Sequence, residues 1–111
     1  SVYAKLFDEC SREWVKDPEL ILMFLRGKQS MLYNMLHACG FVFLNEVYRE
    51  LDLCEPTQEG QVVGLYYTPD HPSFIDFGIY NTNRSTERFV NGYERSILLD
   101  FNVDGVIIDK L

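Results

Sequence analysis

The stretch DFNVDG at residues 100–105 resembles the first half of a calcium-binding loop. Asp100, Asn102 and Asp104 would supply oxygen ligands at positions one, three and five of such a loop. Gly105 would allow the sharp turn at position six. The second half departs from the pattern, because position twelve, which needs a bidentate Glu, is Leu111. The same stretch suits a hairpin turn that ends in Asp-Gly. We expect the turn, with no cofactor, and keep the three oxygen-bearing residues as the alternative metal site.

Alternating side chains predict that carboxylates share one face of a sheet. The apolar sides of two predicted strands form the expected core face: Ile75, Phe77, Ile79, Ile97, Leu99 and Phe101. Asp76 and Asp100 lie on the other sides of these two strands, away from the expected core. At the end of the chain, Asp109 lies on the side opposite Val106 and Ile108 in the same way. If the strands are neighbours, the carboxylates converge and could bind a divalent metal or a basic protein partner. The alternative is the solvated face of a half-exposed antiparallel sheet.

The two histidines do not indicate a catalytic triad. His37 lies near the apolar stripe of a predicted helix, which favours a surface or half-buried position. His71 lies in a predicted turn, where it could titrate near neutral pH. No serine or cysteine is tied to either histidine by spacing as a nucleophile.

Tyrosines supply the remaining candidate interaction residues. Tyr66 and Tyr67 are adjacent, so they must point to opposite faces of a strand. Tyr80 and Tyr93 add further aromatic surface. Exposed tyrosines favour protein interfaces, because they bury a large area at a low cost in side-chain entropy. The alternative is that most of these rings belong to the core.

Composition narrows the classes of function. The chain has 111 residues, 47% of them hydrophobic, and a net charge of -7. This excess of acid disfavours direct binding to a phosphate backbone, and no apolar run approaches the roughly 20 residues that cross a bilayer. The three cysteines include no Cys-x-x-Cys pair, which argues against a zinc site and a disulfide framework and favours a reducing cytosol.

Helix formers dominate the first half of the chain, residues 1–55. A first helix, ending near residue 16, is predicted from apolar residues spaced four, three and four apart: Tyr3, Phe7, Cys10 and Trp14. Asp17 as N-cap and Gly40 as C-terminal residue predict a second helix over residues 18–39. Its apolar stripe is Ile21, Leu25, Leu32, Met35 and Cys39. A third, shorter helix is predicted from the apolar residues Leu44, Val47, Tyr48 and Leu51, with Asn45 as a possible cap and Glu55-Pro56 closing it.

Strand formers dominate residues 56–111. Residues 61–68 and 74–81 are predicted to form an antiparallel hairpin around the turn Pro69-Asp70-His71-Pro72. A short helix is predicted over residues 85–90. Two last strands, residues 97–101 and 106–108, are expected to form a second hairpin.

These elements predict an α+β fold, in which N-terminal helices pack on a small antiparallel sheet of about four strands. Residues 1–111 are expected to form a single domain, with a helical part at 1–55 and a strand-rich part at 56–111.

Four segments carry a resemblance to a known family: FLNEVYRELDL, GQVVG, FIDFGIYN and FVNGYERSILLDFNVDGVI. The chain resembles a family of proteins of unknown function that bacteriophages and prophages of Gram-positive bacteria encode, most specifically over residues 89–107. The family's members are longer, with an apolar N-terminal segment and a charged stretch, so the resemblance implies that this chain is a C-terminal domain. It further implies a bacterial cytoplasmic location with a possible membrane tether outside this chain, and it supplies no catalytic residue.

Taken together, the residues favour a non-enzymatic protein-interaction or structural domain that binds an unidentified protein and makes no membrane contact itself. One alternative is an acidic inhibitor that occupies the nucleic-acid groove of a host defence protein. Another is a metal-dependent hydrolase that uses Asp76, Asp100 and Asp104.

A homodimer is also expected. Six successive apolar residues, Leu20 to Leu25, cannot all face one small sheet. Either the first helix covers the surplus or a second subunit does.

Overall fold

The computed structural model describes residues 3–8, 11–53, 56–79 and 97–111. The predicted helix at 85–90 lies outside them, as do Tyr80 and Tyr93. The described elements are, in order: β1 (Lys5–Phe7), α1 (Pro18–Cys39), β2 (Phe41–Phe43), α2 (Leu44–Leu51), the 3-10 turn η1 (Glu59–Gln61), β3 (Val63–Tyr66), β4 (Ile97–Leu99), β5 (Gly105–Val106) and the 3-10 turn η2 (Ile108–Lys110). The α+β class is therefore confirmed.

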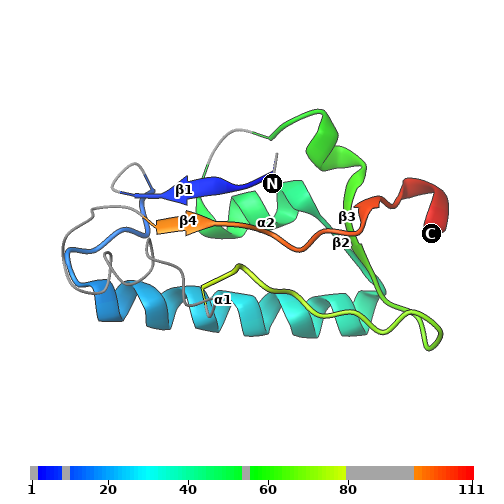
Figure 1. Ribbon diagram of the computed structural model, residues 1–111, viewed down its shortest axis with the longest axis horizontal. Helices are drawn as coiled ribbons and strands as arrows, with labels where there is room; N and C mark the ends of the chain where they lie inside the picture. Colours follow the sequence, from blue (N-terminus) through cyan, green and yellow to red (C-terminus); the bar gives the residue numbers. More distant parts are fainter. Residues whose placement is uncertain (1–2, 9–10, 54–55, 80–96) are drawn as a thin grey trace.

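Helix α1 has the bounds that its capping residues predict. The Asp17 carboxylate accepts hydrogen bonds from the Glu19 and Leu20 N–H groups, and Pro18 occupies the first turn. At the other end, Gly40 is left-handed with φ +88° and donates its N–H to the Leu36 carbonyl at 2.8 Å. The helix runs along one long side of the molecule (Figure 1). Leu36 is fully buried and takes the core position predicted for Met35, while Cys39 is exposed.

The predicted first helix is wrong. Its apolar spacing is real, but Phe7 lies in β1, which pairs antiparallel with β4 in the register Phe7↔Ile97. Phe7 is fully buried, and its ring lies 6.0 Å from that of Trp14 and 5.9 Å from that of Phe24. The residues around Phe7 therefore pack against elements that are distant in the sequence, and this tertiary packing overrides the local helical spacing.

Residues 11–16 are held by the C-terminal end of α2. The buried Ser11 hydroxyl donates to the Leu51 carbonyl at 2.9 Å. The Arg12 backbone N–H and side-chain Nε both donate to Asp52 Oδ2, at 2.8 and 3.1 Å. The side-chain hydrogen bond from Arg12 lowers the pKa of the Asp52 carboxyl, and the reciprocal bond to Asp52 raises the pKa of Arg12. These contacts replace the helical hydrogen bonds that the sequence predicted here.

Helix α2 is confirmed, although Asn45 does not cap it. The N-cap is Phe43, whose backbone N–H donates to Glu46 Oε2 at 3.3 Å. Asn45 instead binds the following loop, because its amide accepts from the Thr57 N–H at 3.0 Å and donates to the Thr57 carbonyl at 2.9 Å.

The predicted sheet of four strands is replaced, in the described residues, by two small antiparallel sheets. One pairs β1 with β4, and the other has the order β2-β3-β5. The last two strands form no hairpin with each other. After β4 the chain crosses to the second sheet, where the Asp104 N–H donates to the Gly64 carbonyl and the Ile107 N–H donates to the Val62 carbonyl, both at 2.8 Å. Strand β5 therefore pairs with β3, and Val106 and Ile108 are more than half exposed while Ile107 is fully buried.

Residues 74–79 keep the predicted alternation without forming a strand. Ile75, Phe77 and Ile79 are buried, whereas Asp76 is half-buried. Gly78 is left-handed with φ +79°, and its N–H donates to Asp76 Oδ1 at 2.7 Å. This local turn interrupts the ladder that the predicted hairpin required. Only the tip of that hairpin is present, as a Thr68↔His71 bridge. The segment lies beside α1, whose Gln29 Oε1 accepts from the Phe77 N–H at 2.9 Å (Figure 1).

Candidate functional site

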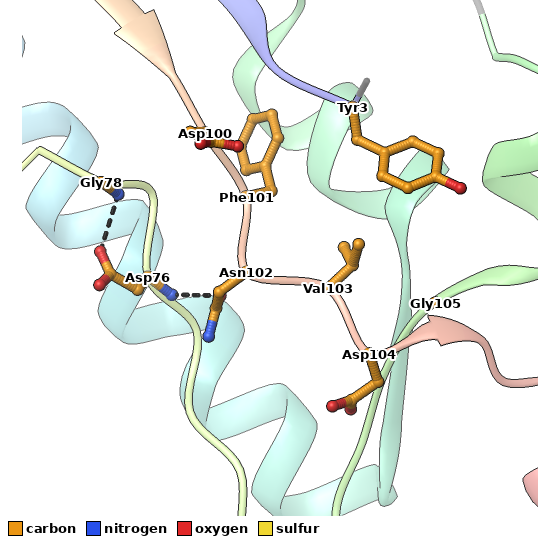
Figure 2. Close-up of a pocket in the computed structure, with 9 residues that line it drawn as sticks. All are labelled: Tyr3, Asp76, Gly78, Asp100, Phe101, Asn102, Val103, Asp104 and Gly105. Atoms are coloured by element: carbon orange, nitrogen blue, oxygen red, sulfur yellow. Dashed lines mark hydrogen bonds between the residues drawn. The ribbon is translucent and has the colours of Figure 1, made fainter. Parts of the chain in front are cut away.

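A pocket of about 510 Å³ lies where three parts of the chain meet. These are Tyr3, two residues before β1, the segment 74–79 and the connection from β4 to β5 (Figure 2). Of the described residues that line it, three are aspartates and none carries a basic side chain: Tyr3, Asp76, Gly78, Asp100, Phe101, Asn102, Val103, Asp104 and Gly105. Asp76 and Asp100, which strand parity predicted to lie on one face, both line this pocket, as does Asp104.

Asn102 holds two walls of the pocket together. Its side-chain Oδ1 accepts from the Asp76 N–H at 2.7 Å, and its Nδ2 donates to the Phe74 carbonyl at 2.7 Å. The Asn102 backbone N–H also donates to the Asp76 carbonyl at 3.3 Å. Next to it, the Asp100 N–H donates to the Phe77 carbonyl at 3.0 Å. These bonds place the segments of Asp76 and Asp100 side by side without a regular ladder (Figure 2).

Asp104 joins the pocket to the turn that follows β3. Its Oδ2 accepts from the Tyr66 N–H at 3.1 Å, and its Oδ1 lies 3.3 Å from His71 Nε2. The His71 ring stacks on Tyr66 with a centroid distance of 4.0 Å and an interplanar angle of 11°. Asp104 therefore fixes the end of β3 and the turn at 68–71, which is a structural role that its calcium-like position did not indicate.

We expect Asp104→Ala to lower the free energy of unfolding by about 1–2 kcal/mol, because the Tyr66 N–H and His71 lose their charged acceptor. Urea denaturation monitored by circular dichroism measures this change. Asp109→Ala removes the same charge from the exposed η2 turn and should change stability by no more than about 0.5 kcal/mol. Equal effects of the two substitutions would show that Asp104 has no such anchoring role.

Among the other predicted interaction residues, the three that the structure describes, Tyr66, Tyr67 and Asp109, do not line the pocket. Tyr66 and Tyr67 have different partners, as their adjacency predicted: Tyr66 stacks on His71, and the Tyr67 ring lies 4.6 Å from that of His37. Asp109 is exposed in η2 and does not line the pocket. Sequence reasoning missed Tyr3, because it assigned this residue to a helix. The Tyr48 hydroxyl of α2 donates to the Tyr3 carbonyl at 3.2 Å, a contact that no local pattern indicates.

The pocket gives no support to the alternative of a metal centre. Within residues 3–8, 11–53, 56–79 and 97–111, no three side chains of the His, Cys, Asp or Glu type are arranged to hold a metal ion. Backbone N–H groups bind oxygens of Asp76, Asn102 and Asp104, so these side chains are oriented toward the protein rather than toward a common centre. The loop at 100–105 also passes between two sheets instead of closing around a cation.

Comparison with known proteins places the whole chain in one family. Residues 1–111 match the model of a family described as a family of unknown function (DUF6353), and the chain belongs to that family. No curated protein and no solved structure matches the chain. In the part of the chain that the structure describes, no helix combines the length and apolar character that crossing a membrane requires.

Proposed function

We propose that this member of the family DUF6353 is a non-enzymatic protein-interaction domain, and that its pocket receives an arginine side chain of a partner protein. The observation that supports the proposal is the lining of the pocket, in which the described residues include Asp76, Asp100 and Asp104 and no basic side chain. An open pocket with three carboxylates attracts a cation, because the negative potentials of the carboxylates add.

Arginine suits this pocket better than a compact cation does. Its planar guanidinium has five N–H donors in a fixed fork, so it can bind carboxylate oxygens that already accept a bond from the backbone. Asp76 and Asp104 are such carboxylates. Tyr3 adds an aromatic ring at one side of the pocket, where it can contact the flat guanidinium (Figure 2). The net charge of -7 would accelerate the encounter with a basic partner.

The biological setting of the proposal comes from the resemblance to phage and prophage proteins. We place the domain in the bacterial cytoplasm, as the C-terminal part of a phage-encoded protein with a membrane tether ahead of it. The partner is then a host or phage protein with an exposed basic segment. The alternative of an acidic inhibitor is the special case in which the partner is a host defence protein and its basic segment lines a nucleic-acid groove.

Titration with a defined peptide tests the proposal. The probe is N-acetyl-Gly-Arg-Gly-amide, and its control contains citrulline, which has the same shape without the charge. We expect the arginine peptide to shift the amide NMR signals of Gly78 and Gly105, and the citrulline peptide to leave them unchanged. Asp100→Asn should weaken binding about threefold, equivalent to about 0.7 kcal/mol for one exposed ion pair. Added salt should weaken it further.

Asp109→Asn is the matched control, because it removes the same charge from an exposed residue outside the pocket. Equal weakening by both substitutions would indicate attraction by net charge alone and would contradict a pocket site. Shifts of the same amide signals by submillimolar Mg²⁺ or Ca²⁺, lost in Asp100→Asn, would favour the metal-dependent alternative instead.

A further inference from the structure

Asp104 belongs both to the pocket and to an ion pair at its margin. Its carboxylate lines the pocket, and its Oδ1 lies 3.3 Å from Nε2 of His71, which is not among the described residues of the lining. The side chains of His71 and Asp104 are 39% and 23% exposed, so water screens their interaction only in part. One of the carboxylates that attract a guanidinium is therefore shared with a titratable ring.

The His71 ring is held in place beside this carboxylate. It stacks on the Tyr66 ring of β3, and the Tyr66 N–H donates to Asp104 Oδ2 at 3.1 Å. The His71 backbone is fixed as well, because its N–H donates to the Thr68 carbonyl at 3.0 Å and its carbonyl accepts from the Thr68 N–H at 3.2 Å. The ring, the carboxylate and the end of β3 thus form one unit.

The proton that charges His71 binds at the nitrogen that faces away from Asp104. An ionised carboxylate only accepts hydrogen bonds, so the neutral ring must carry its hydrogen on Nε2, toward Asp104 Oδ1. Nδ1 then has the lone pair that takes a second proton. Protonation therefore keeps the Nε2–H bond to Asp104 and strengthens it, because the donor becomes a cation.

A charged His71 opposes the binding of arginine. The neutral pocket margin leaves the charges of Asp76, Asp100 and Asp104 to act together on a guanidinium. A proton on His71 places a positive charge beside Asp104 and cancels part of the potential of that carboxylate. The arginine then competes with a cation of the same chain for Asp104, and its affinity falls.

Histidine is the side chain that changes charge in the relevant pH range. Among the described residues, the titratable groups at His71 are Asp104 and Tyr66, which contact it, and Asp70, its neighbour in the turn. Aspartate and tyrosine ordinarily titrate near pH values of about 4 and about 10, and histidine between about 5 and about 8. The other histidine of the chain, His37, contacts two tyrosine rings instead.

We propose that His71 is a proton-controlled competitor for Asp104, so that the pocket binds arginine at neutral pH and releases it under mildly acidic conditions. This inference rests on the proposed function, because it assigns a regulation to the same pocket. The shared carboxylate carries it, since Asp104 is the described residue that both lines the pocket and pairs with a histidine.

Peptide titrations at two pH values test the inference. The probe is N-acetyl-Gly-Arg-Gly-amide, followed by the amide signals of Gly78 and Gly105 at about pH 7.5 and about pH 5.5. We expect the Kd of wild type to be about threefold higher at the lower pH, the effect of one exposed ion pair. His71→Gln keeps an N–H donor without a titrating group, so its Kd should be the same at both pH values. His71→Lys carries the charge throughout and should bind weakly at both.

His37→Gln is the matched control, because it removes the other histidine and should keep the pH dependence of wild type. An equal wild-type Kd at the two pH values would overturn the inference and leave the proposed function intact. Binding at neither pH would overturn both. A pH dependence that persists in His71→Gln, or that disappears in His37→Gln, would show that another group controls the pocket. The amide spectra of the variants report whether each is folded.

Discussion

Gly64→Ala is expected to lower the free energy of unfolding by about 3 kcal/mol, because strand β3 has no room for a side chain at this residue. A Cβ there would collide with the Val42 carbonyl oxygen and lie 2.9 Å from the Phe43 Cα. Both obstacles are backbone atoms, so no rotation of a side chain relieves the clash. Because β3 is the central strand between β2 and β5, any shift disturbs both of its neighbours. Guanidinium denaturation monitored by tryptophan fluorescence measures the loss.

Gly27→Ala is the matched control for this substitution. It adds the same methyl group, but into open space within α1. We expect it to stabilise the chain by about 0.5–1 kcal/mol, since alanine is the better helix former. Both variants should be measured at low protein concentration, so that self-association does not contribute. A Gly64→Ala protein within about 0.5 kcal/mol of wild type would show that β2 and β3 are not packed as closely as described.

The sequence was sufficient to predict α1 and α2, because both carry strong local signals. For α1, Asp17, Pro18 and Gly40 determine the two ends through hydrogen bonds that reach no further than four residues. For α2, the buried positions Leu44, Val47 and Leu51 keep helical spacing. Local chemistry and tertiary packing agree in these segments.

The strands could not be paired correctly from the sequence. Residues 97–101 and 106–108 flank an Asp-Gly turn that is typical of a hairpin, yet β4 pairs with a strand about ninety residues earlier in the chain. The reason is nonlocal: Phe7 and Ile97, which face each other in the ladder, are both fully buried in the core. No pattern within either segment records that partner.

The candidate site was partly predictable for a similar reason. Alternation is a local property, so it correctly placed Asp76 and Asp100 on the sides opposite buried residues. For both residues to line one pocket, the two segments also had to be neighbours, and the backbone hydrogen bond from the Asp100 N–H to the Phe77 carbonyl holds them side by side. The anchoring bonds of Asn102 and Asp104 depend on exact positions of distant backbone atoms, and residue types alone do not indicate them.

The pocket depends on residues 74–79, which form no regular strand ladder and are held by separate hydrogen bonds and by side-chain packing. Phe77 is fully buried, and its ring contacts that of Phe101 edge-on at 5.5 Å. Its N–H and carbonyl bind Gln29 of α1 and the Asp100 N–H, at 2.9 and 3.0 Å. The backbone of Phe77 therefore joins the wall that carries Asp76 to the helix and to the wall that carries Asp100, and its ring packs on Phe101 in the second of these walls. Removing the Phe77 ring should therefore change both the position and the stability of the pocket.

Phe77→Ala is accordingly expected to lower the free energy of unfolding by about 3–5 kcal/mol, the usual cost of emptying a phenylalanine site in a core. Phe74→Ala is its control, because Phe74 lies three residues away but is 62% exposed, and it should change stability by no more than about 0.5 kcal/mol. Urea denaturation gives both values, and hydrogen exchange at the Gly78 amide reports separately on the pocket wall. If Phe77→Ala accelerates exchange at Gly78 while global stability falls by less than about 1 kcal/mol, residues 74–79 form a locally opening flap. The inference that this segment is an integral part of the core would then be wrong.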